Sequence, residues 1–219
     1  MFENRSWSPG QRGDPSLPRR RLIVGISGAT GIVYGVRLLQ ILRELDVESH
    51  LVVSRAGELT RAYETAHSAA DLRKLADVSY RASDVGAAIS SGSFRTMGMV
   101  VAPCSIRTLS EIATGVTGTL LTRAADVCLK ERRRLVLMVR ETPLHAGHLK
   151  SMLAVTEAGG IIAPPVPAFY NRPQSLDEMV HHTVARVLDL FDLDTPTTRR
   201  WGETSGEGSA DAGPPAEGK

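Results

Sequence analysis

Four short polar segments follow apolar runs and carry the residues best suited to chemistry. They are Ser27 to Thr30, Ser54, Cys104 to Thr108, and Arg140 with Glu141. Hydroxyls and backbone amides at such turns can bind an anion, and a cation beside a carboxylate can hold charge and move a proton. If the preceding runs are parallel strands, all four segments meet at one edge of a sheet, where ligands of α/β proteins bind.

The first segment is a glycine turn between an apolar run at Leu22 to Ile26 and a helical pattern that continues to Leu42. This strand, turn and helix predict an anion site at a helix N-terminus. The glycine spacing differs from G-x-G-x-x-G, and no Lys-Ser/Thr pair follows, so neither a dinucleotide fingerprint nor a P-loop is present. The hydroxyls of Ser27, Thr30 and Ser54 favour a mononucleotide phosphate. A plain tight turn is the alternative.

Several other polar residues also have a structural interpretation. Ser105 is placed to cap a helix, and Cys104 is most simply a small packing residue. By pattern alone, Glu64, Arg37, Arg123 and Arg186 are solvated helix residues. The cations at a predicted helix end are expected to complement its dipole and face water; they are Lys130, Arg132, Arg133 and Arg134. The histidines 145, 148, 181 and 182 have no ligand spacing and are interpreted as surface residues.

Apolar runs alternate with helical patterns along the chain. Strands are expected at 22–26, 49–53, 97–102, 135–139 and 161–163, and helices at 58–66, 69–75, 108–113, 120–130, 149–158 and 176–190. This order predicts a single α/β domain with three αβα layers and a flavodoxin- or Rossmann-like parallel sheet. The domain is expected to span 21–203, between a disordered extension at 1–20 and a disordered tail at 204–219.

Composition narrows the function classes. The chain has 219 residues and a formal net charge of +2, which does not suggest nucleic-acid binding. Its two cysteines form no C-x-x-C motif, which suggests a reducing compartment and no metal site. No apolar run has the length of a membrane helix, and the N-terminus lacks the apolar core of a signal peptide. A cytoplasmic protein is expected.

Five sequence blocks, in this order, closely resemble the UbiX-type flavin prenyltransferases. They are GISGATG at 25–31, APCSIRTLSEIATG at 102–115, RAADVCLKERRRLVLMVRETPL at 123–144, PAFYNRPQSLDEMV at 167–180, and RWGE at 200–203. The resemblance implies a subunit that binds FMN and forms a homo-oligomer, commonly a dodecamer, with sites between subunits. It also implies transfer of a dimethylallyl group from dimethylallyl monophosphate to N5 and C6 of reduced FMN, without a metal. The product would pass to a UbiD-type decarboxylase.

The resemblance also assigns roles to individual residues. FMN would be held by Gly28, Ala29, Thr30, Ser54, Ser105, Ile106, Arg107, Thr108 and Arg140. The prenyl phosphate would be bound by Lys130, Arg140, Tyr170 and Arg186, with Ser91, Gly92 and Arg123 nearby. Glu64 and Glu141 would handle protons, and Lys130 would assist the departure of phosphate.

Two positions depart from the family pattern, and two other functions remain as alternatives. Thr30 replaces a common Ser, and Arg107 replaces a usual Lys or Gly. One alternative is an FMN-dependent cysteine-type decarboxylase of the same fold, although its Met-containing clamp is not matched at 167–171. The other is a non-catalytic flavin-binding subunit. The sequence leaves open whether the donor is a monophosphate or a pyrophosphate.

Overall fold

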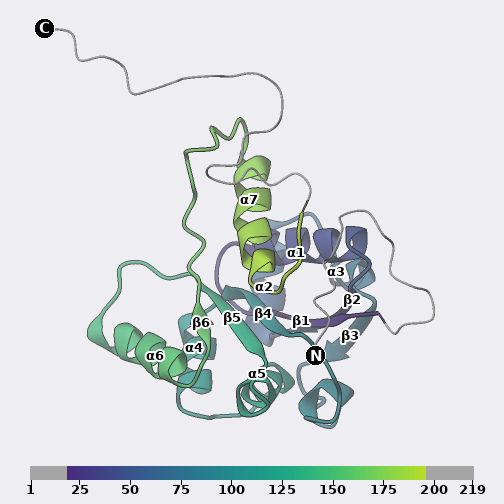
Figure 1. The fold of residues 1–219 in the computed structure, drawn as a ribbon, viewed down its shortest axis with the longest axis vertical. Coiled ribbons are helices and arrows are strands. Elements are labelled where there is room, and N and C mark those ends of the chain that lie inside the picture. The colour runs from purple at the N-terminus through teal and green to yellow at the C-terminus, as the bar shows by residue number, and fades with distance from the viewer. Residues whose placement is uncertain (1–18, 196–219) are drawn as a thin grey trace, which may run out of the picture.

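The computed structural model describes residues 19–195 and contains a six-stranded, fully parallel sheet (Figure 1). The strand order is β3-β2-β1-β4-β5-β6. Strands β2 and β3 are therefore added on one side of β1, and β4, β5 and β6 on its other side, so the order of strands switches between β1 and β4. The strands are β1 (Arg21–Ile26), β2 (Glu48–Val53), β3 (Val78–Arg81), β4 (Gly98–Cys104), β5 (Arg134–Val139) and β6 (Ile161–Ile162). The helices are α1 (Ile32–Glu44), α2 (Arg55–Glu64), α3 (Ala69–Leu75), α4 (Ile106–Ala113), α5 (Leu120–Lys130), α6 (Ala146–Glu157) and α7 (Leu176–Asp189), with a 3₁₀ turn η1 (Ala88–Ser90).

Helices cover both faces of the sheet and create two separate cores. On one face, alternate residues of β1, β2, β4 and β5 pack with α1, α3 and α7. On the other face, the intervening strand residues pack with α4, α5, α6 and η1. Because successive strand residues point to opposite faces, strands buried on both sides are almost continuously apolar. This is the predicted three-layer α/β arrangement, and it is confirmed.

The glycine-rich start of the domain permits unusually close packing. A Cβ atom on Gly35 would lie 2.5 Å from the carbonyl oxygen of Ala102, so α1 can approach β4 only with glycine at this position. Gly31 precedes α1 with a φ of 99°, a left-handed conformation that glycine adopts readily. The turn and the helix therefore require these glycines for backbone reasons.

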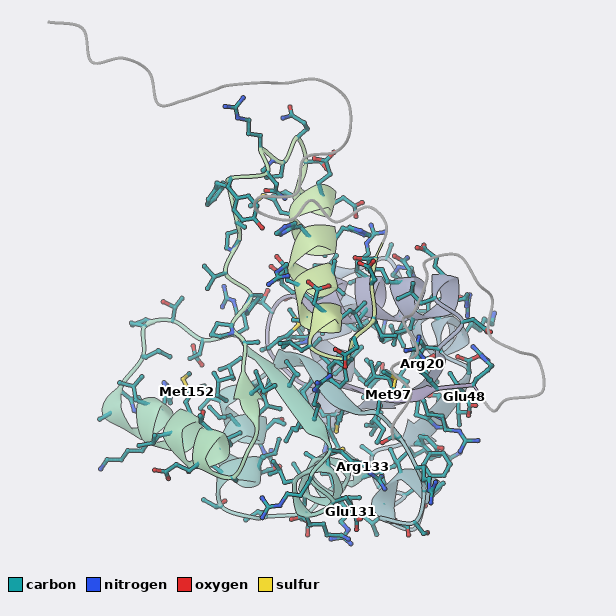
Figure 2. All side chains as sticks on the ribbon, in the orientation of Figure 1. Arg20, Glu48, Met97, Glu131, Arg133 and Met152 are labelled. Carbon is teal, nitrogen blue, oxygen red and sulfur yellow. The ribbon has the colours of Figure 1, made fainter. Side chains whose placement is uncertain are left out.

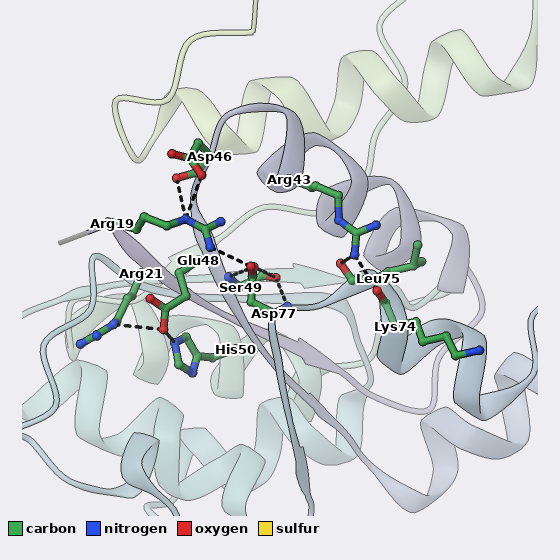
Figure 3. Close-up of polar contacts among 10 residues, drawn as sticks. All are labelled: Arg19, Arg21, Arg43, Asp46, Glu48, Ser49, His50, Lys74, Leu75 and Asp77. Carbon is green, nitrogen blue, oxygen red and sulfur yellow. Dashed lines mark hydrogen bonds and ion pairs between the residues drawn. The ribbon is translucent and has the colours of Figure 1, made fainter. Parts of the chain in front are cut away.

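At the amino end of the sheet, a polar network joins β1, β2 and β3 (Figure 3). The carboxylate of Glu48 accepts from Arg21 Nε at 3.2 Å, and its Oε1 lies 2.9 Å from Nε2 of His50. The other ring nitrogen of His50 lies 2.9 Å from the Tyr80 hydroxyl. Burial lowers the pKa of His50, although the neighbouring Glu48 opposes this shift. His50 is therefore a buried polar residue whose two ring nitrogens both have partners.

Asp77 makes a second connection in the same network. Its carboxylate accepts from the amide and hydroxyl of Ser49 at 2.8 and 2.9 Å, and from Arg19 at 2.8 Å. Burial raises the pKa of Asp77, but these hydrogen bonds outweigh it and hold the pKa below its ordinary value. The carbonyl oxygen of Arg20 accepts from the Glu48 amide at 2.8 Å. Both Arg19 and Arg20 therefore contact the sheet, although the sequence prediction placed them in the N-terminal extension.

Several predicted element boundaries differ from the structure. Strand β3 is absent from the prediction because it alternates between half-buried and exposed residues at the sheet edge and lacks an apolar run. Helix α2 begins at Arg55, directly after its Ser54 cap, and α6 begins at Ala146 after a His145 cap. The predicted residues 196–203, the C-terminal tail and residues 1–18 lie outside the described part. Within residues 19–195, no helix is long and apolar enough to span a bilayer.

Candidate functional site

The carboxyl ends of β2, β1, β4 and β5 are joined by a continuous set of hydrogen bonds. The Ser54 amide donates to Ile26 O at 2.9 Å, and the Ser105 amide donates to the Ser27 hydroxyl at 2.7 Å. The Arg140 amide donates to Cys104 O at 3.0 Å. The predicted convergence of these four segments at one edge is therefore present in the structure.

Two helices begin at this edge with serine caps. Ser54 Oγ accepts from the Gly57 amide at 3.0 Å at the start of α2. Ser105 Oγ accepts from the Thr108 amide at 3.3 Å at the start of α4 and also donates to the Thr108 hydroxyl. The structural reading of Ser105 as a helix cap is thus confirmed. The first amides of a helix lack carbonyl partners within it, so both helices present positive ends to this edge.

A third helix N-terminus, that of α1, holds a carboxylate. Oε2 of Glu64, the last residue of α2, accepts from the amides of Gly31 and Ile32 at 2.8 and 3.0 Å. Charge and donor geometry at a helix N-terminus both favour an anion, and here the anion is a side chain of the same molecule. Glu64 is exposed, but it is not simply solvated as its helical position alone suggested.

The turn between β1 and α1 is held close to α2. A Cβ atom on Gly28 would lie 2.3 Å from Cβ of Ala56, so only glycine fits without a shift of the backbone. Ser27 is fully buried, and its hydroxyl donates to Pro103 O at 3.0 Å. Ala29 is half-buried and Thr30 is exposed, so both lie on the accessible side of this turn.

Arg140 and Glu141 extend the edge beyond β5, and both are exposed. Burial raises the pKa of the Tyr34 phenol on α1, whereas the positive charge of Arg140 lowers it, which places Arg140 close enough to act on α1. Glu141 Oε1 accepts from the Thr142 amide at 3.1 Å.

At the start of α4, Ile106 is half-buried, and the exposed Arg107 pairs with Glu111 at 2.9 Å.

A pocket of about 570 Å³ opens beside Ser54, at the carboxyl ends of β2 and β3. Its lining includes Arg55, Arg73 and Arg81 together with Glu58, which pairs with Arg73 at 3.2 Å. The sequence prediction missed these lining residues because β3 was not recognised. The arginines add positive charge at the same edge as the helix N-termini.

A second group of predicted site residues lies along α5. The Arg123 guanidinium donates to Ser90 O at 3.2 Å and pairs with Asp126 at 2.7 Å. A Cβ atom on Gly92 would lie 2.9 Å from Nζ of Lys130, so this loop and the end of α5 are in contact. Lys130 precedes the start of β5, which puts it at the amino edge of the sheet, opposite the carboxyl edge described above. Ser91 is exposed on the same loop.

The expectation that Arg133 faces water is wrong. Its guanidinium donates to the carbonyls of Phe94 and Gly92, which ties the 91–94 loop to the segment after α5. Figure 2 shows Arg133 close to Glu131 beside α5. Both carbonyls belong to half-buried residues, so the guanidinium satisfies backbone acceptors that are partly shielded from water. Arg133 therefore shapes the loop that contains Ser91 and Gly92.

A third group lies with α7. The hydroxyl of Tyr170, in the segment before α7, is 3.2 Å from Nε2 of His182. Arg186 is exposed and pairs with Asp189 on the same helix. The interpretation of His182 as a surface residue is wrong, since it is buried at 7% exposure. It lies three residues before the buried Ala185, a helical spacing from which the burial could have been predicted.

Other residues singled out in the sequence have structural roles. His145 caps α6, and His148 is half-buried, with its ring tilted by 32° against that of His145 and the ring centroids 3.6 Å apart. Cys104 is fully buried, and burial raises its thiol pKa, as expected for a packing residue. Burial also raises the pKa of Cys128, to about 12. Within residues 19–195, no three His, Cys, Asp or Glu side chains are grouped as metal ligands.

The sheet keeps these groups apart within one chain. Helix α5 packs on one face and α7 on the other, while the serine-lined edge lies between the two faces. Lys130 and Arg186 therefore do not meet in a single subunit. The carboxyl edge itself suits a mononucleotide phosphate, because it combines the N-termini of α2 and α4 with several hydroxyls and a glycine turn in close contact with α2.

Comparison with known proteins agrees with this geometry. The family model described as flavoprotein matches residues 12–187. The flavin prenyltransferase UbiX of Neisseria meningitidis is 57% identical over 182 residues, which cover 83% of this chain and 96% of that protein. A crystal structure of AnUbiX (PadA1) in complex with FMN and dimethylallyl pyrophosphate has a TM-score of 0.84 and 50% identity, and covers 85% of this chain and 100% of its own.

A second solved structure bears on assembly. The dodecameric FMN-dependent UbiX-like decarboxylase from Escherichia coli has a TM-score of 0.81 and 54% identity, over 84% of this chain and all of that one. The family model's match, residues 12–187, includes the serine-capped edge, α5 and most of α7. The chain therefore belongs to the flavoprotein family and, within it, to the UbiX flavin prenyltransferases.

Proposed function

We propose that this protein transfers a dimethylallyl group from dimethylallyl monophosphate to N5 and C6 of reduced FMN. The observation that carries the proposal is the edge at which Ser54, Ser27, Ser105 and Arg140 are joined by hydrogen bonds. It is supported by the relatives named as flavin prenyltransferases and by the related structure that contains FMN and a dimethylallyl ester. The alternative of a cysteine-type decarboxylase has no comparable support.

At the carboxyl edge, the chain's own groups would hold FMN through hydroxyls and amides. Gly28, Ala29 and Thr30 come from the first turn and Ser54 from the second strand. The remaining contacts would come from the start of α4 and the end of β5; these residues are Ser105, Ile106, Arg107, Thr108 and Arg140. FMN, when bound and reduced, supplies the nucleophilic ring atoms that accept the prenyl group. Glu64, already at the α1 N-terminus, would lie beside this site and take part in proton transfer.

The phosphate of the prenyl donor would be held by cations and a phenol. Lys130, Arg140, Tyr170 and Arg186 all donate hydrogen bonds, and Arg forms paired bonds to phosphate oxygens. Their effect grows as the allylic C–O bond breaks, because the departing phosphate gains negative charge. Glu141 would protonate that phosphate or accept the proton lost from the flavin.

We further propose that a homo-oligomer completes the site, because the sheet separates α5 from α7 within one chain. Ser91, Gly92, Arg123 and Lys130 of one subunit would then meet the carboxyl edge or the α7 group of others. The dodecameric state of a relative that is 54% identical supports this assembly. The prenylated product would be passed to a UbiD-type decarboxylase.

The test is to incubate the purified protein with reduced FMN and dimethylallyl monophosphate and to measure the mass of the flavin. A gain of one five-carbon unit is expected, and its absence with both the monophosphate and the pyrophosphate would end the proposal. Glu141→Gln should slow product formation about 10²- to 10⁴-fold, the usual contribution of an acid–base residue. Full activity in this variant would favour a different proton donor.

A further inference from the structure

The contact between Tyr170 and His182 joins an exposed phenol to a buried imidazole. The phenol oxygen and Nε2 are 3.2 Å apart, and the two rings meet edge to face with centroids 5.7 Å apart. Tyr170 is 47% exposed, whereas His182 is 7% exposed. One side of the phenol is thus held by the protein, and the other side lies at the molecular surface.

The location of this contact ties Tyr170 to the α7 group. His182 and Arg186 are four residues apart on α7, so their side chains leave the same face of the helix. Tyr170 itself lies between β6 and α7, in a segment that contains neither helix nor strand. An aromatic residue in such a segment needs a tertiary contact to keep one orientation, because fixing a flexible side chain costs entropy.

The chemistry of the pair fixes which atom must donate. A phosphate oxygen only accepts hydrogen bonds, so Tyr170 can assist phosphate only by donating its O–H to it. The phenol oxygen can then accept from Nε2–H of His182. In the opposite arrangement, with the phenol donating to an unprotonated Nε2, oxygen lone pairs would face the anion and repel it.

We propose that His182 is a positioning residue for Tyr170: Nε2–H donates to the phenol oxygen and thereby directs the phenol O–H toward the phosphate of the prenyl donor. This inference rests on the proposed function and deepens it. It adds to the site a histidine that would touch neither substrate. The binding of phosphate selects the tautomer in which Nε2 carries the hydrogen.

The test compares His182→Phe, which keeps a ring but removes the donor, with His182→Gln, whose amide N–H can still donate. His182→Phe should raise KM for dimethylallyl monophosphate about three- to tenfold, the range for loss of one hydrogen bond. His182→Gln should stay within about twofold of the wild type. In the Tyr170→Phe background, His182→Phe should have no further effect, because the phenol on which it acts is gone. FMN affinity should be unchanged in all of them.

Thr183→Val provides a matched control, since it also removes a side-chain hydrogen bond from α7, here to Met179 O. It should leave KM unchanged. Equal effects of His182→Phe and His182→Gln, or additive effects of His182→Phe and Tyr170→Phe, would overturn the proposal. Calorimetric titration of the FMN-loaded variants with dimethylallyl monophosphate gives the same comparison without turnover. The two proposals can thus fail separately. A wild type that forms no prenylated flavin would refute the activity, whereas the titration would still test the role of His182 in binding the donor.

Discussion

Ser27→Ala is the sharpest test of how the carboxyl edge is held together. The Ser27 hydroxyl is fully buried, accepts from the Ser105 amide at 2.7 Å and donates to Pro103 O at 3.0 Å. Pro103 O keeps a partner in the variant, because the Ser27 amide also donates to it at 3.1 Å. The cost therefore comes mainly from the Ser105 amide, which loses its acceptor.

An unsatisfied amide in a mostly buried position costs about 1–3 kcal/mol. For a domain of this size, a loss of about 2 kcal/mol lowers Tm by about 4–8 °C. The same change should weaken FMN binding, because Ser105 caps the helix proposed to hold it. Thermal unfolding at one protein concentration and fluorescence titration with FMN measure the two effects.

Ser93→Ala is the matched control, since Ser93 lies on an exposed loop and, within residues 19–195, its hydroxyl bonds only to that of Ser91. It should change Tm by less than about 1 °C, as is usual for surface substitutions. If Ser27→Ala matched this control in both Tm and FMN affinity, the Ser27 hydroxyl would not join β1 to β4 in solution.

Two further substitutions test the packing of the turn and the buried histidine. Gly28→Ala should destabilise the protein by about 1–3 kcal/mol, because its Cβ would lie 2.3 Å from Cβ of Ala56. Gly118→Ala is the control and should leave stability nearly unchanged, because a Cβ there would meet no atom within 4 Å. Equal Tm values for the two variants would contradict this reasoning. Because burial lowers the pKa of His50, the unfolded protein binds its proton more readily, and stability should fall as the pH drops below about 6.5. His50→Gln should flatten that part of a Tm-against-pH curve more than His67→Gln does, and identical curves would refute the reasoning.

The strand–turn–helix unit and the serine-lined edge could be predicted because their signals are local. An apolar run, a glycine turn and a helical repeat at 22–42 specify β1, the turn and α1 without reference to distant residues. The ends of parallel strands then converge by topology alone, which brings Ser54, Ser105 and Arg140 together. Strand β3 could not be predicted in this way, because it lies at the sheet edge and has no apolar run.

Contacts between distant segments account for the remaining differences. Arg133 looked like one of several solvated cations, but its partners are carbonyls about forty residues earlier in the chain, which charge patterning does not reveal. The burial of His182 follows from its helical spacing to Ala185, but its contact with Tyr170 could not be predicted, because Tyr170 lies in an irregular segment. The position of Lys130 and Arg186 on opposite faces of the sheet follows from helix placement, which residue spacing alone does not fix.

A mixing experiment tests most directly the claim that prenyl transfer occurs at a site shared between subunits. Lys130→Ala and Arg186→Ala are produced separately and by co-expression, and the mass of the flavin is measured after incubation with reduced FMN and dimethylallyl monophosphate. Each variant alone should form little product, and the co-expressed protein should regain part of the wild-type rate, because some sites receive both intact cations. A co-expressed protein no more active than the separate variants, beside an active wild type, would contradict the shared site.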